Sequence, residues 1–192
     1  RGKHLITTCV APSSIHNAME QLKEYFGYEV TYLPVNASGS VDVEALKQAL
    51  RKDTILVSMM LVNNETGAIN PIRACADYVH ANSRALFHVD GVQALGKVEV
   101  DLSCVDLATF SAHKIYGLKG SAILYKKKHV ELVPLISGGQ QENGMRAGTS
   151  NAPVNIVFAK TLRLALEQQK EAYAHVKALN ARSEERRVGK EC

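Results

Sequence analysis

The feature that most constrains the fold is an alternation of short apolar runs with longer amphipathic segments. The run TILVSMMLV, residues 54–62, contains no charged side chain, which is typical of a strand buried on both faces of a sheet. Segments with helical periodicity, residues 41–51 and 72–83, lie on either side of it. Since a helix that crosses a sheet joins two parallel strands, the pattern predicts an α/β fold with a mostly parallel sheet.

The same alternation extends along most of the chain. We expect strands at residues 4–10, 29–35, 54–62, 85–90, 106–113 and 121–128. We expect helices at residues 13–26, 41–51, 72–83 and 154–180, and Ser13 or Ser14 as the N-cap of the first one. Because such helices cover both faces of the sheet, the expected fold class is a three-layer αβα sandwich.

The composition indicates a folded domain, since 46% of the residues are hydrophobic and 22% are charged. A chain of 192 residues can bury one sizeable core. The net charge of +4 comes from scattered basic residues, and the one dense cluster, Lys126–Lys128, ends a predicted strand. We therefore expect no nucleic-acid partner. No apolar run is long enough to cross a bilayer and no signal-peptide pattern opens the chain, so we also expect no membrane.

The four cysteines, Cys9, Cys75, Cys104 and Cys192, form no CxxC pair, and no two histidines have the spacing of a zinc protease. The sequence therefore predicts no metal site and favours a reduced, cytoplasmic protein. The first three cysteines lie in apolar surroundings, where a buried thiol without a catalytic role is the expected state.

Polar residues gather after three of the predicted strands. Asn64 follows the third strand, and Asp90 ends the fourth. The fifth strand ends with Ser111, His113 and Lys114. In parallel sheets, ligands bind beyond the carboxyl ends of the strands. We therefore expect these residues to form one site.

Lys114 indicates the chemistry of this site, because a deprotonated lysine amine bonds covalently to an aldehyde. If the chain turns helically after Asp90, Gln93 returns to the same side, and the two can hold a heteroaromatic ring with a protonated nitrogen. In extended chain, Ser111 and His113 point to one face and can donate to a phosphate. These are the groups that pyridoxal 5'-phosphate requires.

Each of these residues taken singly has a simpler explanation. Asp90 fits a helix N-cap, Lys114 a surface lysine, and His113 a hydrogen-bonded structural histidine. Their combination with Gln93 favours the cofactor site.

Four ordered motifs extend this interpretation: LVNNETGAINPI, HVDGVQALGK, DLATFSAHKIYGLKG and GGQQENGMRAGTSN. Together they resemble the cysteine desulfurase family, in the class V aminotransferase group of fold-type I pyridoxal-phosphate enzymes. The resemblance covers nearly all of residues 1–180. The segment GGQQENGMRAGT is similar to the branch that serves iron–sulfur cluster assembly.

The resemblance implies a role for each site residue. Lys114 would be the Schiff-base lysine, Asp90 the partner of the pyridinium nitrogen, and Gln93 the amide that bonds the ring hydroxyl. Thr149 would reach the phosphate of a neighbouring subunit, which implies a homodimer. The cofactor-binding set implied in this way is Asn64, Asp90, Gln93, Ser111, His113, Lys114 and Thr149.

The resemblance also implies an activity, in which sulfur is removed from L-cysteine to give L-alanine and an enzyme persulfide. The sulfur would pass to an acceptor or iron–sulfur scaffold protein. Two alternatives stay open. One is another class V aminotransferase or lyase, and the other is a non-catalytic fragment that retains the fold.

The sequence departs from the family pattern at several positions. Ala11 and Pro12 stand where the family has Glu-His, and His16, one helical turn on, is not expected to replace that histidine. Leu118 stands where a proline is usual. No residue after Lys114 matches the family's nucleophilic cysteine or its carboxylate-binding arginine. The chain therefore resembles the middle of the cofactor domain, with weak or no turnover expected.

The last segment, RSEERRVGKEC, lacks apolar periodicity and matches the translation of a common sequencing-library adapter. We therefore interpret residues 1–181 as a partial pyridoxal-phosphate-binding large domain and residues 182–192 as a non-native tail. A genuine basic tail is the alternative.

Overall fold

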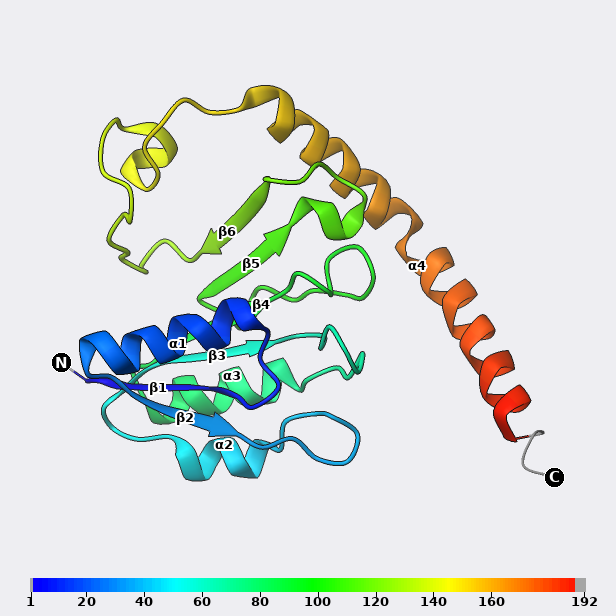
Figure 1. Ribbon diagram of the computed structural model, residues 1–192, viewed down its shortest axis with the longest axis horizontal. Coiled ribbons are helices and arrows are strands. Elements are labelled where there is room, and N and C mark those ends of the chain that lie inside the picture. Colours follow the sequence, from blue (N-terminus) through cyan, green and yellow to red (C-terminus); the bar gives the residue numbers. More distant parts are fainter. Residues whose placement is uncertain (1, 189–192) are drawn as a thin grey trace.

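The alternating apolar and amphipathic segments form one six-stranded sheet with helices packed against it (Figure 1). The computed structural model describes residues 2–188, with side chains as far as residue 183. The strands are β1 (His4–Thr8), β2 (Glu29–Leu33), β3 (Thr54–Met60), β4 (Leu86–Asp90), β5 (Leu107–Ser111) and β6 (Ala122–Lys126). The helices are α1 (Ser13–Phe26), α2 (Val43–Ala49), α3 (Ile72–Asn82) and α4 (Ala152–Val188), with short 3₁₀ turns η1 (Ala112–Ile115) and η2 (Gln141–Gly144).

The strand order is β2-β1-β3-β4-β5-β6, and the first five strands are parallel. Only β6 is antiparallel, paired with β5. Met60 is in register with Asp90, and Asp90 with Thr109, so the carboxyl ends of β3, β4 and β5 lie at one edge of the sheet. The mostly parallel α/β sheet predicted from the sequence is confirmed.

The helices cover opposite faces of this sheet. Val57 and Phe87 are fully buried and belong to one core cluster with Leu46 of α2 and Val79 of α3. α1 lies on the other face (Figure 1). Residues alternate between faces along a strand, so Asp90 and the residues at even spacing from it project toward the α1 side. Burial of each large core side chain stabilises the fold by about 2 kcal/mol.

Strand β5 is shorter than expected, which corrects the prediction of a strand over residues 106–113. It ends at Ser111, where the chain enters η1. Tyr116 closes this turn with a left-handed φ of 67°. The N–H of Gly117 then donates to the carbonyl of Ala112 at 2.9 Å, and a Cβ on Gly117 would lie 2.8 Å from the Cβ of Ala112. This tight turn, which requires a glycine, stops the strand.

The predicted serine cap of α1 is also wrong. The helix begins at Ser13 with Pro12 as its N-cap, and no side chain caps it. The proline has φ −66° and its carbonyl accepts from the N–H groups of Ile15 and His16 at 2.9 Å. Proline is tolerated here because its missing N–H is not needed at a helix start.

Helix α4 continues to Val188, beyond the predicted end at residue 180. Its first half packs on the rest of the fold: Phe158 is buried, and the Gln169 side chain donates to the Val98 carbonyl at 2.5 Å. Residues 182–188 follow as helix, since Glu and Arg favour helix even without an apolar face. The interpretation of 182–192 as a non-native tail stays a prediction, and residues 189–192 with Cys192 lie outside the described residues. Among residues 2–188, no helix is both long and apolar enough to cross a membrane.

Candidate functional site

The predicted site residues follow neighbouring strands at the carboxyl edge of the sheet. Asp90 is the last residue of β4, and Lys114 lies in η1, directly after β5. Asn64 lies in the loop after β3. These strands are adjacent in the order β3-β4-β5, so the structure brings these three segments to the same edge, as expected.

Asp90 is a buried carboxylate, with only 5% of the residue exposed. Its Oδ1 accepts from the backbone N–H of Val92 at 2.9 Å. Burial raises the pKa of Asp90, and the hydrogen bond from Val92 opposes that rise only in part. Among the described side chains, no ion pair involves this carboxylate. A buried carboxylate in this state gains strongly from a ligand that supplies a positive N–H group.

Gln93 lies on the turn that follows Asp90. The N–H of Leu95 donates to the carbonyl of Gly91 at 3.0 Å, so the backbone turns helically, as predicted. The Gln93 Oε1 accepts from Lys97 Nζ at 3.0 Å. The Gln93 amide group is thereby anchored through its oxygen, and its NH₂ group is available as a donor.

Lys97 is a site residue that the sequence reasoning missed. Its pKa is lowered, first by burial and then by the positive charge of Lys114. The signal was present in the motif HVDGVQALGK, where Lys97 follows Gln93 by four residues. On a helical turn that spacing brings two side chains together.

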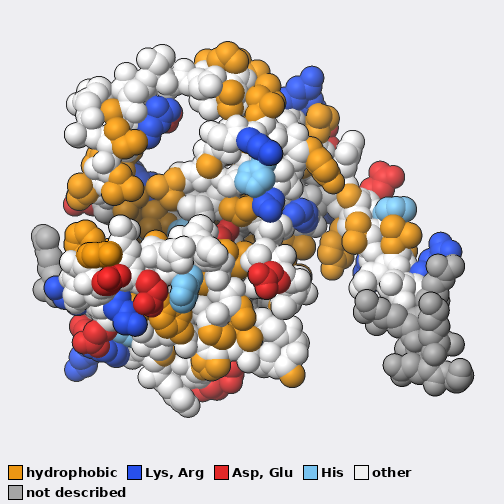
Figure 2. Space-filling view, in the orientation of Figure 1, with side chains coloured by type: hydrophobic (Ala, Val, Ile, Leu, Met, Phe, Trp, Pro, Cys, Tyr) orange, Lys and Arg blue, Asp and Glu red, His pale blue; other side chains and the backbone are white. Residues whose placement is uncertain are grey.

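The turn η1 contributes the side chains of His113 and Lys114 to the candidate site. His113 and Lys114 are exposed, while Ser111 is half-buried at the end of β5. Basic and histidine side chains gather over this turn (Figure 2). Because the chain is helical from Ala112, Ser111 and His113 do not share one face of an extended strand, and that geometric argument is corrected. The local excess of positive charge still favours an anion such as phosphate.

The two asparagines of LVNNETG have different environments. Asn63 is buried, and its side-chain oxygen accepts from the backbone N–H groups of Glu65 and Thr66 at 2.9 Å. Its amide donates to the Val10 carbonyl at 3.1 Å, which ties this loop to the β1–α1 loop. Asn63 therefore shapes the loop, and Asn64 is exposed, with its side chain free to meet a ligand.

Thr149 lies apart from these residues, in the long segment between β6 and α4, and it is exposed. No described hydrogen bond connects its side chain to the sheet edge. Its proposed role in a neighbouring subunit stays a prediction.

His16 does not take the place of the missing histidine at position 12. Its ring packs on Tyr32, with ring centroids 5.3 Å apart. The Tyr32 hydroxyl donates to Glu20 at 2.5 Å, and burial together with Glu20 raises the pKa of Tyr32 to about 12. His16 is therefore part of a cluster between α1 and β2.

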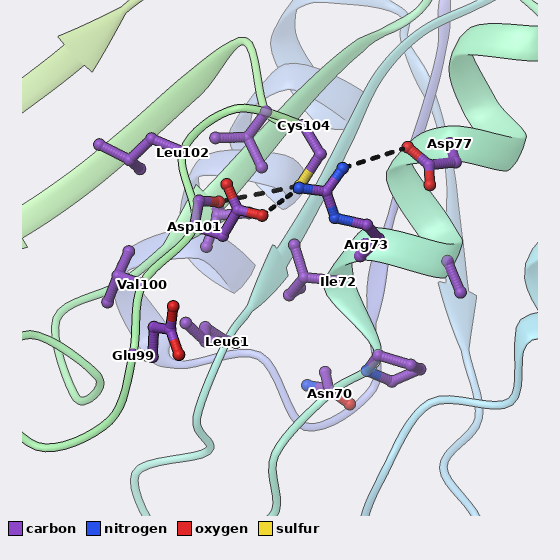
Figure 3. A pocket seen from close by; sticks show the side chains of 14 residues that line it. Leu61, Asn70, Ile72, Arg73, Asp77, Glu99, Val100, Asp101, Leu102 and Cys104 are labelled. Atoms are coloured by element: carbon purple, nitrogen blue, oxygen red, sulfur yellow. Dashed lines mark hydrogen bonds and ion pairs between the residues drawn. The ribbon is translucent and has the colours of Figure 1, made fainter.

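Figure 3 shows a cavity of about 590 Å³ at the amino end of α3 that is not the predicted site. None of the seven predicted site residues lines it. Arg73 at its wall pairs with Asp101, lies 4.0 Å from Asp77, and donates to Ser103 at 2.7 Å. These polar groups of the wall thus bind one another.

Comparison with protein families identifies the architecture. A family described as Aminotransferase class-V matches residues 1–187. A solved NifS-like protein superimposes with a TM-score of 0.92 at 39% identity, over 95% of this chain and 50% of that one.

Two curated relatives are similar in sequence. A protein named cysteine desulfurase IscS, from Dictyoglomus turgidum, is 47% identical over 174 residues, 89% of this chain and 44% of the relative. A protein named mitochondrial cysteine desulfurase, from Candida albicans, is 40% identical over 189 residues, 94% of this chain and 37% of the relative. The chain thus spans less than half the length of these two relatives.

Proposed function

The chain belongs to the class-V aminotransferase family, and on that basis we propose that it is the cofactor-binding part of a pyridoxal-phosphate-dependent cysteine desulfurase. The observation that carries the proposal is the Asp90 carboxylate, which is buried without a cationic partner among the described side chains. It lies at the same edge of the sheet as the turns that carry Gln93 and Lys114. The similarity to proteins named cysteine desulfurase supports the choice of substrate.

The residues present fit the cofactor. A protonated ring nitrogen would give Asp90 the positive N–H that it lacks. Gln93 can donate its NH₂ group to a ring hydroxyl, because Lys97 already holds its oxygen. Ser111 and His113 supply donors for a phosphate dianion in a region of positive charge.

When bound, pyridoxal phosphate withdraws electrons from the α-carbon of an amino acid. Lys114 would hold the cofactor covalently through Nζ, and its amine would be the group that carries a proton near the α-carbon. Asp90 would hold a proton at the ring nitrogen. Lys97 would keep the Gln93 amide in place through its oxygen. Asn64, exposed in the loop after β3, would contact the ring on its substrate side.

For the whole protein we propose L-cysteine as substrate, with L-alanine and an enzyme persulfide as products. The sulfur then passes to an acceptor or iron–sulfur scaffold protein. We also propose a homodimer in which Thr149 reaches the neighbouring phosphate, and a cytoplasmic location.

A second candidate is another class V aminotransferase or lyase. The observation that favours it is Pro12, which caps α1 where an imidazole is expected and offers neither an aromatic face nor a ring nitrogen. The product separates the two: release of alanine from L-cysteine supports the desulfurase, and transfer of an amino group to a keto acid supports the alternative.

The test of the cofactor site is borohydride reduction of the chain with pyridoxal phosphate, followed by peptide mass spectrometry. We expect one labelled lysine, Lys114, and no label in the Lys114→Ala variant. The matched control is Lys119→Ala, which removes an exposed lysine from the same turn region and leaves the label in place. A label on Lys97 or Lys119 instead of Lys114 contradicts the proposal.

A further inference from the structure

A histidine two residues before Asp90 ties three strands together below the candidate site. His88, on β4, contacts Ser58 of β3 through Nδ1 at 2.8 Å. Through Nε2 it contacts Thr109 of β5 at 3.3 Å. One imidazole therefore joins the strand that carries Asp90 to both of its neighbours. We call Ser58, His88 and Thr109 the carboxyl-end clamp.

The opposite end of the sheet contains a similar arrangement. His4, on β1, contacts the hydroxyl of Thr54 at 2.7 Å and that of Thr31 at 2.9 Å. These hydroxyls belong to β3 and β2, the two neighbours of β1. This amino-end clamp lies at the start of the parallel strands, away from the predicted site. It is therefore a matched control for any role that is only structural.

The carboxyl-end clamp lies in the layer directly below Asp90. Residues 88 and 90 project to the same face of β4, and Thr109 is the register partner of Asp90 on β5. Burial lowers the pKa of His88 to about 4, so the ring is neutral at pH 7. One of its nitrogens donates and the other accepts, and each has a hydroxyl partner. The side chains of the carboxyl-end clamp are thus polar and hydrogen-bonded but uncharged.

From this arrangement we infer that His88 is a positioning residue for Asp90. It fixes β4 between β3 and β5 and places neutral dipoles next to the carboxylate. The positive charge that pairs with Asp90 therefore comes from the bound ligand and not from the protein. The inference rests on the proposed function, in which that ligand is a protonated pyridine ring. A lysine or arginine at this position would neutralise Asp90 from within the protein and remove the reason for the ligand to bind there.

The test measures the pKa of Asp90 by ¹³C NMR of its carboxyl group in the cofactor-free 192-residue chain. In His88→Leu, two dipoles are lost and the layer becomes more apolar, so we expect the pKa of Asp90 to rise by about one unit. His4→Leu should lose a similar amount of stability and leave this pKa unchanged. His88→Gln, which keeps one donor and one acceptor, should restore the original value in large part.

A second measurement uses the affinity for pyridoxal phosphate, which should fall about tenfold in His88→Leu relative to His4→Leu, because β4 is no longer fixed between β3 and β5 and Asp90 loses its position. If His88→Leu does not fold, Thr109→Val removes one arm of the clamp at nearly constant volume and should move both quantities in the same direction. An unchanged or lowered pKa of Asp90 in these variants overturns the inference. Because the NMR measurement needs no cofactor, failure of the proposed function is seen separately, as absence of the borohydride label on Lys114.

Discussion

Two buried aspartates, Asp90 and Asp106, lie at opposite ends of neighbouring strands and have opposite surroundings. Asp90 ends β4, and Asp106 immediately precedes β5. Their exposures are 5% and 4%, so burial does not distinguish them. What differs is the number of groups that compensate each charge.

Asp106 is surrounded by donors. It accepts from the Phe87 N–H at 2.8 Å and binds His80 Nε2 at 2.7 Å. Lys127 and His129 lie at 3.7 and 3.6 Å from its other oxygen. Burial alone would raise the pKa of Asp106, but the Phe87 N–H, His80 and Lys127 outweigh it and hold the pKa below its ordinary value.

Asp90 has one backbone donor, and its pKa is raised. The two buried carboxylates therefore differ in the partners that the protein supplies to them. At the amino end the protein itself supplies the partners, so Asp106 stabilises the structure. At the carboxyl end the described side chains supply no cation, so Asp90 costs stability in the free protein, and in the proposed cofactor site it would regain that stability on binding.

The largest effect on stability is expected from Asp106→Ala. Removing this carboxylate leaves the buried Phe87 N–H and the His80 ring without their acceptor, which should lower the free energy of unfolding by about 3 kcal/mol. Urea denaturation measures this loss. Asp101→Ala, at an exposed aspartate, serves as the control. A loss no larger than the control value would show that the Asp106 network is not structural.

The Asp90→Asn substitution should change the free energy of unfolding less than Asp106→Ala does, and in the opposite direction. The amide keeps an acceptor for the Val92 N–H and removes an unpaired buried charge, so the free energy of unfolding should stay the same or rise by about 1 kcal/mol. Cofactor binding should fall sharply, because an amide does not pair with a protonated ring nitrogen. Differential scanning calorimetry and titration with pyridoxal phosphate measure both quantities. If this variant is as unstable as Asp106→Ala, the contrast fails.

The two aspartates should also give opposite pH dependence. Asp106 has a folded-state pKa below its ordinary value of 3.8, so its stabilisation is present above pH 3.8 and is lost as the pH falls through the folded-state value. Asp90 has a raised pKa, so its contribution is present below pH 3.8 and is lost as the pH rises through the raised value.

This contrast can be measured by urea unfolding across the acid range with the two Asn variants. Asp106→Asn should reduce the gain in the free energy of unfolding that accompanies a rise in pH. Asp90→Asn should remove the decrease in this free energy that occurs as the pH rises through the raised pKa of Asp90. Parallel stability profiles for the two variants would contradict the assignment of opposite shifts.

The smallest effect is expected at the cavity beside α3. Arg73 is exposed and its partner Asp101 is too, so Arg73→Met should leave the thermal midpoint almost unchanged at physiological salt. Pyridoxal phosphate should still label Lys114, since none of the predicted site residues lines the cavity. Loss of the label in this variant would connect the two regions.

The periodicity of the sequence was sufficient to predict the parallel sheet, because strands and helices differ in their hydrophobic period. It also placed Asp90 and Lys114 at the ends of strands that are consecutive along the chain. The end of β5 could not be predicted in this way, since it depends on the left-handed Tyr116 and on the contact between Gly117 and Ala112. The helical cap at Pro12 was missed because a serine is the more common cap.

Lys97 and His88 show a second limit of prediction from the sequence. The role of Lys97 depends on its distance from Lys114, which lies on another strand connection. The role of His88 depends on the order β3-β4-β5, which places Ser58 and Thr109 on either side of it. Hydrophobic periodicity contains no information on strand order, so these contacts required the structure.

The close approach of Gly96 to α4 has a mechanical consequence. A Cβ at position 96 would lie 2.8 Å from the Cβ of Ala165, and Gly96 has a left-handed φ of 70°. Ala165 lies about 10 Å along the helix from the buried Phe158, and Val188 lies about 45 Å from it, at 1.5 Å per residue. The helix meets the fold at Phe158, at Ala165 and at Gln169, and its last part projects beyond the sheet (Figure 1). If a side chain on residue 96 pushed Ala165 outward by one ångström while Phe158 stayed in place, Val188 would move by about four ångströms. The absence of a side chain at Gly96 therefore determines the direction of α4 relative to the sheet.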